Sequence, residues 1–327
     1  MPSPALIDPH NRHIEYLRVS VTDRCDLRCV YCMPEGFTDF EEPADWLTFD
    51  ELERLLGAFA RLGVSRIRFT GGEPLLRRNL PELAGRITRL PGIRDLSMSS
   101  NATQLEKHAV ALKQAGVSRL NISLDSLDPE RIKAINGRDA HRRIMAGIEA
   151  ARAAGFDPIK INMVAMAGVN DDEIDDMVDF CIRNSFVLRL IETMPMGETG
   201  RNASYLDLQP VRERLKARFD LLDAQLPGGG PARYLRSADG RFSVGFITPI
   251  SQHFCDSCNR VRLSVDGTLY LCLGQEHSFN FRPLLRANVS DAELEQAIHH
   301  AIGLKPQRHE FTEKPQQIVR FMSMTGG

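Results

Sequence analysis

A regular alternation of short apolar segments and longer amphipathic segments runs from residue 16 to residue 219, and it constrains the fold more than any other feature. Residues 66–70 and 119–124 have the length and β-branched content of strands, whereas residues 51–62 place Leu and Phe at helical spacing. Six such strand-then-helix units predict parallel strands joined by helical crossovers. The pattern alone fits a partial barrel, a complete barrel or an open doubly wound sheet.

The alternation stops at residues 226–231 (LPGGGP), a Gly- and Pro-rich segment that predicts a loop or linker. Short strand candidates and one helical pattern at residues 291–302 follow it. We therefore expect two regions, residues 1–225 with the alternating units and a smaller C-terminal region at residues 226–327. In parallel α/β folds, ligands bind at the C-terminal ends of the strands, so polar residues at those ends are candidate site residues.

Six of the seven cysteines form two groups of three, which we call the N-terminal and C-terminal triads. The N-terminal triad directly follows the first expected strand and comprises Cys25, Cys29 and Cys32. The C-terminal triad comprises Cys255, Cys258 and Cys272. Thiolates suit zinc and iron–sulfur clusters, and three of them leave one iron of a four-iron cluster open. Zinc usually takes four closed ligands, and it stays an alternative mainly for the C-terminal triad, which His253 and His277 flank.

Composition excludes several functional classes. The chain carries 41 Lys and Arg against 43 Asp and Glu, so its bulk charge predicts neither nucleic-acid nor membrane-surface binding. We expect no transmembrane helix and no secretory signal, because the sequence lacks a long apolar run. Seven cysteines in 327 residues fit a reducing cytoplasm better than a disulfide framework.

Two motifs carry a resemblance to a known superfamily. The CxxxCxxC spacing, with Tyr31 before the last cysteine, resembles the signature of radical S-adenosylmethionine (SAM) enzymes, and residues 71–74 (GGEP) resemble their second motif. The C-terminal triad, residues 191–197 (IETMPMG), residues 258–263 (CNRVRL) and the terminal Gly326 and Gly327 resemble the GTP 3′,8-cyclase family of molybdenum cofactor biosynthesis. This similarity covers the chain from about residue 15 to its last residue.

The resemblance implies an incomplete (β/α)6 barrel of the radical SAM type, with a smaller C-terminal region carrying a second cluster. It implies a [4Fe–4S] cluster on the N-terminal triad that binds SAM, and a second [4Fe–4S] cluster, rather than zinc, on the C-terminal triad. The implied enzyme is a lyase. A 5′-deoxyadenosyl radical removes H3′ of GTP, and the C3′ radical attacks guanine C8 to give (8S)-3′,8-cyclo-7,8-dihydroguanosine 5′-triphosphate.

The resemblance also assigns roles residue by residue. The implied SAM contacts are Tyr31, Gly72, Glu73, Ser123 and Met194. The implied GTP contacts are Arg18, Arg68, Ser99, Lys160, Arg260, Val261 and Arg262. The residues implied to assist catalysis are Arg18, Gly326 and Gly327. Plain structural roles remain open for many of them: a tight turn for Gly72, packing for Met194, a frayed end for the terminal glycines.

One turn departs from the family pattern. Residues 99–102 read SSNA, with Ala102 where the family has Gly, so we expect Asn101 to take the left-handed backbone conformation. We expect a homodimer and two protein partners, a flavodoxin-like or ferredoxin-like electron donor and a cyclic pyranopterin monophosphate synthase that takes the product. The alternatives are another radical SAM enzyme with an auxiliary cluster, and a zinc-binding structural protein. The basic residues and the terminal Gly-Gly favour the nucleotide.

Overall fold

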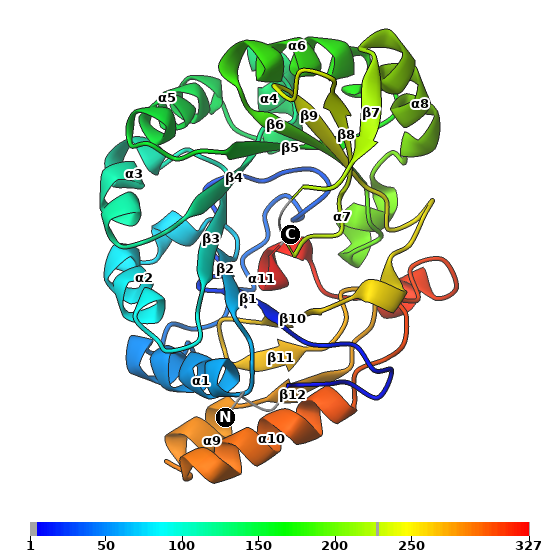
Figure 1. Cartoon of the computed structure of the whole chain (residues 1–327). Helices are drawn as coiled ribbons and strands as arrows, with labels where there is room; N and C mark the ends of the chain where they lie inside the picture. Colours follow the sequence, from blue (N-terminus) through cyan, green and yellow to red (C-terminus); the bar gives the residue numbers. More distant parts are fainter. Residues whose placement is uncertain (1–4, 227–228, 327) are drawn as a thin grey trace.

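Six parallel strands lie side by side in chain order and curve into a partial barrel (Figure 1). The computed structural model describes residues 5–226 and 229–326. The strands are β1 (Tyr16–Ser20), β2 (Arg66–Thr70), β3 (Asp95–Ser100), β4 (Arg119–Ser123), β5 (Ile159–Ala165) and β6 (Val187–Glu192). A doubly wound sheet reverses its strand order at a switch point, and this order never reverses. The structure therefore confirms the barrel alternative.

Strands that follow β6 in the chain extend both edges of this sheet. At one edge, β9 (Ser243–Ile247) pairs in parallel with β6 and leads antiparallel to β8 (Arg233–Ser237) and β7 (Leu221–Ala224). At the other edge, β10 (Arg260–Leu263) pairs in parallel with β1 and is followed by β11 (Thr268–Tyr270) and β12 (Ser278–Asn280). The boundary expected after residue 225 thus falls between β7 and β8, which pair with each other. The division into two regions stays a prediction.

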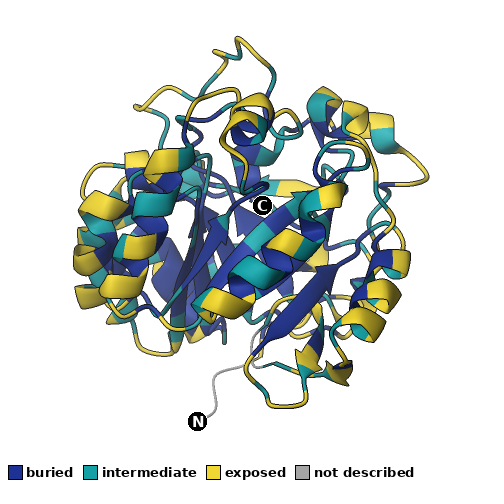
Figure 2. Ribbon diagram, turned by 90° about the horizontal axis from the view of Figure 1, so that it is seen from above, coloured by how far each residue is buried: buried dark blue, intermediate teal, exposed yellow. Residues whose placement is uncertain are grey.

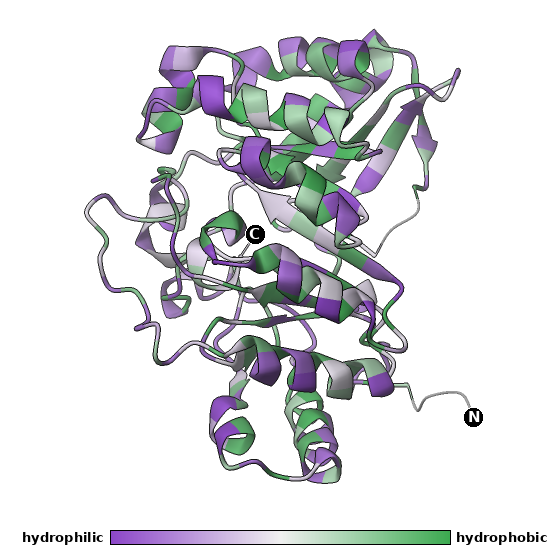
Figure 3. Ribbon diagram, turned by 90° about the vertical axis from the view of Figure 1, so that its left-hand side faces the viewer, coloured by the Kyte–Doolittle hydropathy of each residue, from purple (hydrophilic) through white to green (hydrophobic). Residues whose placement is uncertain are grey.

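Helices cover the outer face of the sheet and expose their polar sides (Figures 2 and 3). They are α1 (Phe49–Arg61), α2 (Leu80–Thr88), α3 (Leu105–Gln114), α4 (Pro129–Asn136), α5 (His141–Ala153), α6 (Ile174–Asn184) and α8 (Leu208–Arg218). The others are α7 (Gly197–Asn202), α9 (Arg282–Arg286), α10 (Asp291–Gly303) and α11 (Met322–Thr325). Capping boxes start α1 at Thr48 and α10 at Ser290. None of the helices in the described ranges is long and apolar enough to span a bilayer.

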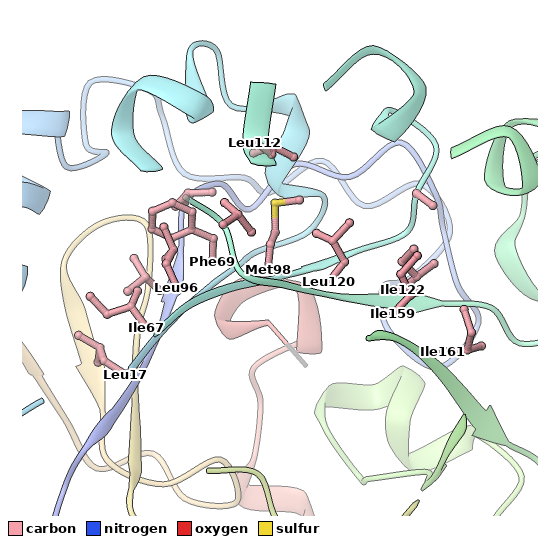
Figure 4. Close-up of a cluster of buried hydrophobic side chains, with 14 of the residues drawn as sticks. Leu17, Ile67, Phe69, Leu96, Met98, Leu112, Leu120, Ile122, Ile159 and Ile161 are labelled. Carbon is pink, nitrogen blue, oxygen red and sulfur yellow. The ribbon is translucent and has the colours of Figure 1, made fainter. Parts of the chain in front are cut away.

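The hydrophobic core lies between the strands and the outer helices, as Figure 4 shows for Leu17, Phe69 and Met98. Side chains alternate between the two faces of a strand. On β2, Ile67 and Phe69 therefore enter this core, whereas Arg68 and Thr70 point into the barrel. The apolar face of each strand packs against the helices, and the opposite face forms the polar interior of the barrel.

Gly147 of α5 allows this helix to pack against the turn after β3, because a Cβ there would lie 2.0 Å from the carbonyl oxygen of Ala102. We expect Gly147→Ala to lower the free energy of unfolding by about 1–3 kcal/mol. Gly85 of α2 is the matched control, since a Cβ there meets only the Arg89 guanidinium at 3.6 Å. Gly85→Ala should raise stability by about 0.5–1 kcal/mol. Anaerobic denaturant titration measures both, and equal effects would contradict the packing argument.

Candidate functional site

One cavity lies at the C-terminal ends of the barrel strands and brings both cysteine triads together. All six of their cysteines line it, and so do Arg18, Arg68, Arg260 and Arg262. The sequence predicted both groups separately. Their meeting in one cavity follows from β10 pairing beside β1, which places the C-terminal triad across from the loop after β1.

The N-terminal triad lies in that loop, where short backbone contacts fix it. The Leu27 amide donates to Cys25 Sγ at 3.4 Å, and the Cys32 amide donates to the carbonyl of Cys29 at 2.9 Å. Burial raises the pKa of the Cys25 and Cys32 thiols to about 12 and raises that of Cys29 as well. Three desolvated thiols in one loop suit a group that brings its own positive charge, as iron does, so the residues fit a cluster.

The C-terminal triad spans two strands. Cys255 and Cys258 lie before β10, and Cys272 follows β11. Burial raises the pKa of Cys255 and Cys272. At Cys258 burial acts in the same direction, but the neighbouring Lys305 and Arg260 outweigh it and lower the pKa to about 7. This environment favours a thiolate, the form that binds iron.

Buried arginines line the cavity between the triads. In the parallel register, Arg18 lies directly beside Arg262 on one side and Arg68 on the other. Arg260 belongs to the same face of β10, and Arg189 reaches the cavity from β6. Each of the five is less than a tenth exposed, and no salt bridge in the described ranges neutralises any of them. Burial lowers the pKa of Arg68 and Arg189 to about 10, and the crowding of like charges adds to this.

These guanidinium groups also have unused donors. The Nε atoms of four of them are buried without a partner: Arg18, Arg189, Arg260 and Arg262. Arg68 Nε donates to Ser97 Oγ at 3.2 Å. Unpaired buried charge is costly, and Arg binds phosphate oxygens in a bidentate manner. The arrangement therefore suits a polyanion such as a triphosphate.

Lys160 lies at the start of β5, as expected, and does not line the cavity. The residues of β5 that line the cavity are Asn162 and Val164, nearer the C-terminal end of the strand. The Nζ of Lys160 donates to the Tyr234 hydroxyl at 3.5 Å and lies 5.6 Å from the ring centroid. Burial lowers the pKa of Lys160 to about 7, with Arg189, Arg119 and Arg68 contributing. A direct contact of Lys160 with substrate stays a prediction.

Four of the five residues expected to bind SAM line the cavity: Tyr31, Gly72, Ser123 and Met194. The Tyr31 hydroxyl donates to Asp125 at 2.7 Å. Gly72 also meets the need for a close turn, because a Cβ there would lie 2.3 Å from the carbonyl oxygen of Arg24. The glycine is therefore required by the approach of two backbones, whatever ligand binds beside it.

Glu73, the fifth residue expected to contact SAM, does not line the cavity, and its contact with SAM stays a prediction. It is fully buried, and its carboxylate accepts bonds from Ser100 Oγ at 2.9 Å and from the amides of Leu75 and Asn101. These bonds join the turn after β2 to the turn after β3.

Val261 has only its backbone to offer a substrate, as expected, whereas the turn after β3 differs from the expectation. The side chain of Val261 lies in the hydrophobic core opposite Arg260 and Arg262, so it offers the cavity no side-chain contact. The left-handed residue in the turn after β3 is Ala102, with φ at 65°, and not Asn101. Ala102 is held there because its amide donates to Ser100 Oγ and α5 packs on its carbonyl. Ser99 lines the cavity, and its hydroxyl is buried without a partner.

The C-terminal tail enters the barrel mouth, where α11 is seen at the centre of Figure 1. Gly326 has φ at 70°, and a Cβ there would lie 2.3 Å from Thr70 Cβ, so only glycine fits. Gly327 lies outside the described residues. Arg320 anchors the tail, since it is 3% exposed, binds Glu276 at 2.7 Å and donates to the carbonyls of residues 272, 273 and 275.

Three buried cations of the site were not expected from the sequence: Arg189, Arg320 and Lys305. The signal for Arg189 was present, because it is the one charged residue inside the apolar strand VLRLI. Arg320 and Lys305 follow no motif or period, and only their contacts reveal them.

The comparisons with known proteins agree with this site. The description "Radical SAM superfamily" matches residues 19–181, and "Molybdenum Cofactor Synthesis C" matches residues 186–311. A GTP 3′,8-cyclase of Pseudomonas entomophila (strain L48) is 50% identical over 329 residues, covering 99% of this chain and 98% of that protein. GTP 3′,8-cyclase 1 of Pseudomonas aeruginosa PAO1 is 48% identical, covering 98% and 99%. The chain belongs to the GTP 3′,8-cyclase family.

Membership of this radical SAM family implies [4Fe–4S] clusters and SAM as cofactors, as expected from the sequence, and favours iron over zinc at the triads. A solved structure supports the fold. Streptococcus suis SuiB bound to S-adenosylmethionine has a TM-score of 0.63 at 17% identity, covering 89% of this chain and 69% of that one. The assignment of individual ligands to individual residues stays a proposal.

From the lowered pKa of Lys160 we predict that the stability of the folded chain depends on pH. In the folded chain this lysine loses its proton near pH 7, whereas the unfolded chain keeps it to about pH 10.5. Between these values the unfolded state binds more protons, so this residue makes the free energy of unfolding rise with pH. Lys160→Met should remove that rise between pH 7 and 9, measured by denaturant titration without substrate. Lys113→Met, on the exposed face of α3, is the control and should keep it.

Because the buried arginines of the cavity lack a neutralising partner, we predict that anions stabilise the folded chain. Tripolyphosphate should raise the melting temperature of the wild-type chain, because it binds the folded state alone. Arg189→Met should weaken that binding about tenfold or more, as expected for loss of a charge-assisted contact. The variant without anion should be at least as stable as the wild type, since one unneutralised buried charge is gone. A variant that binds tripolyphosphate as tightly as the wild type would contradict this role of Arg189.

Proposed function

We propose that this chain converts GTP to (8S)-3′,8-cyclo-7,8-dihydroguanosine 5′-triphosphate, the first step of molybdenum cofactor biosynthesis. The observation that carries the proposal is that two cysteine triads and five buried, unneutralised arginines line one cavity. An enzyme of this kind needs a radical source, a second cluster and a triphosphate site within reach of one another. Full-length identity near 50% to proteins named GTP 3′,8-cyclase supports the same function.

We assign the cofactors to residues as follows. Cys25, Cys29 and Cys32 hold the N-terminal cluster, and Cys255, Cys258 and Cys272 hold the C-terminal cluster. Bound together, the N-terminal cluster and SAM supply a 5′-deoxyadenosyl radical that removes H3′ of GTP, so that C3′ can bond to guanine C8. We assign SAM to Tyr31, Gly72, Ser123 and Met194, which line the same cavity as the N-terminal triad.

The protein itself contributes position and a closed environment. Arg18, Arg68 and Arg262 are fixed side by side by strand register, so they hold the triphosphate without first having to be gathered. The Nε donors of Arg18 and Arg262 are buried and unpaired before GTP arrives, and binding satisfies them. The tail around Gly326 closes the mouth of the barrel and limits access of water to a reactive radical. We propose that Gly326 and Gly327, together with Arg18, assist the cyclisation from this position.

The proposal extends to partners and setting. The two clusters need electrons, so we propose a flavodoxin-like or ferredoxin-like donor, and a cyclic pyranopterin monophosphate synthase as consumer of the product. None of the seven cysteines, all of which lie in the described ranges, forms a disulfide, which suits a reducing cytoplasm. The homodimer stays a prediction.

An anaerobic assay tests the function. The chain is reconstituted with iron and sulfide and given SAM and a strong reductant, with GTP, with ATP or with neither. Formation of 5′-deoxyadenosine and loss of nucleotide are followed together by chromatography. We expect GTP to disappear in step with 5′-deoxyadenosine and ATP to survive. Arg262→Leu should lower kcat/KM for GTP about 10- to 100-fold, because it removes a charged contact.

The other outcomes of this assay are equally informative. Cleavage of SAM with survival of GTP would keep the radical SAM chemistry and refute the substrate, leaving another radical SAM enzyme with an auxiliary cluster. A colourless protein that binds zinc and no iron would refute the proposal as a whole.

A further inference from the structure

Lys305 is a buried lysine behind the C-terminal triad, two residues beyond the end of α10. It is 3% exposed, and its ammonium has three acceptors for its three protons. These are the carbonyl oxygen of Leu271 at 2.5 Å, that of Arg260 at 3.2 Å and the sulfur of Cys258 at 3.8 Å. Leu271 adjoins Cys272, so the ammonium bridges the two chain segments that carry Cys258 and Cys272.

A second buried cation fixes the segment that follows Lys305. Arg12 is paired with Asp8 at 2.6 Å and donates to the carbonyls of Pro306 at 2.7 Å and Gln307 at 2.6 Å. The same guanidinium donates to the carbonyl of Cys255 at 2.9 Å. The chain after Lys305 is thus tied to the first cysteine of the triad, and the position of the ammonium follows from the fold.

The charges around the N-terminal triad differ from those around the C-terminal triad. There the side chain that donates to Cys25 Sγ is the neutral amide of Asn101, at 3.8 Å. The carboxylates of Glu73 and Asp125 lie nearby and act electrostatically on Cys25 and Cys29. Within the described residues, no Lys or Arg donates to a sulfur of that triad. The two triads therefore share a cavity but differ in electrostatic environment.

We propose that Lys305 is a positioning residue for the C-terminal cluster, which holds Cys258 in place and keeps the reduction potential of that cluster above what a neutral side chain would allow. One-electron reduction adds negative charge to a cluster, and a buried ammonium beside a ligand sulfur stabilises that charge. Groups around a metal site tune it through such contacts. The inference rests on the proposed function, because it requires a cluster at the C-terminal triad.

The test isolates that cluster in the full-length chain. The parent carries Cys25→Ala, Cys29→Ala and Cys32→Ala, so that only the C-terminal triad binds iron. Lys305→Met, Lys305→Arg and the surface control Lys113→Met are added to it. Iron per chain is measured, and the midpoint potential is found by titration followed by electron paramagnetic resonance. Lys305→Met should make reduction about tenfold less favourable, about 59 mV for one electron, whereas Lys305→Arg and Lys113→Met should stay within about threefold of the parent.

Each outcome decides a question. Loss of iron in Lys305→Met with unchanged far-ultraviolet circular dichroism, and recovery in Lys305→Arg, would support the positioning role. Full iron content and an unchanged potential in Lys305→Met would overturn the proposal. Loss of iron in both variants would show that the charge is not the cause, and would overturn it too. Absence of iron in the parent would instead refute the C-terminal cluster, and with it the proposed function.

Discussion

Three like charges stand side by side in the barrel interior because β10, β1 and β2 pair in parallel with Arg262, Arg18 and Arg68 in register. The sheet can hold them there because the opposite faces of the same strands carry Leu17, Ile67 and Val261 into the core. Burial of the apolar face supplies the free energy, and the crowded cations are a local cost. The buried cations therefore lower the stability of the folded chain when no anion is bound, and binding of a polyphosphate restores the most stability.

The C-terminal region completes the site by joining the same sheet. If β10 belonged to a separate sheet, Arg260, Arg262 and the C-terminal triad would have no fixed relation to the N-terminal triad. Pairing with β1 gives them that relation through backbone hydrogen bonds alone. Buried cations then hold the loops and the tail that the strands do not reach: Arg12, Lys305 and Arg320. Side chains that satisfy several carbonyls at once serve where regular pairing ends.

The sequence was informative wherever local chemistry decides the outcome. The strand at residues 66–70 has the predicted limits and the strand expected at residues 119–124 ends one residue earlier, because their period and their flanking turns are local signals. Helix α4 was not predicted, although Asp128 and Pro129 mark its start. The expected unit of one strand and one helix was already complete with β4 and the longer α5. Ala102 was judged unfit for a left-handed turn from its type. The packing of α5 and the hydrogen bond that the Ala102 amide donates to Ser100 Oγ override that preference.

By itself the sequence determined the cysteine spacing, the strand–helix period and the cationic residues, because each depends on positions a few residues apart. The tertiary structure alone decided which of them meet. Strand order excluded the doubly wound sheet, and strand alternation sent Val261 to the core while Arg260 and Arg262 reached the cavity. Glu73 became a brace between two turns, and Lys305 came to the C-terminal triad from 33 residues beyond Cys272. Contacts of that range are set by packing and pairing of whole elements, which no local pattern encodes.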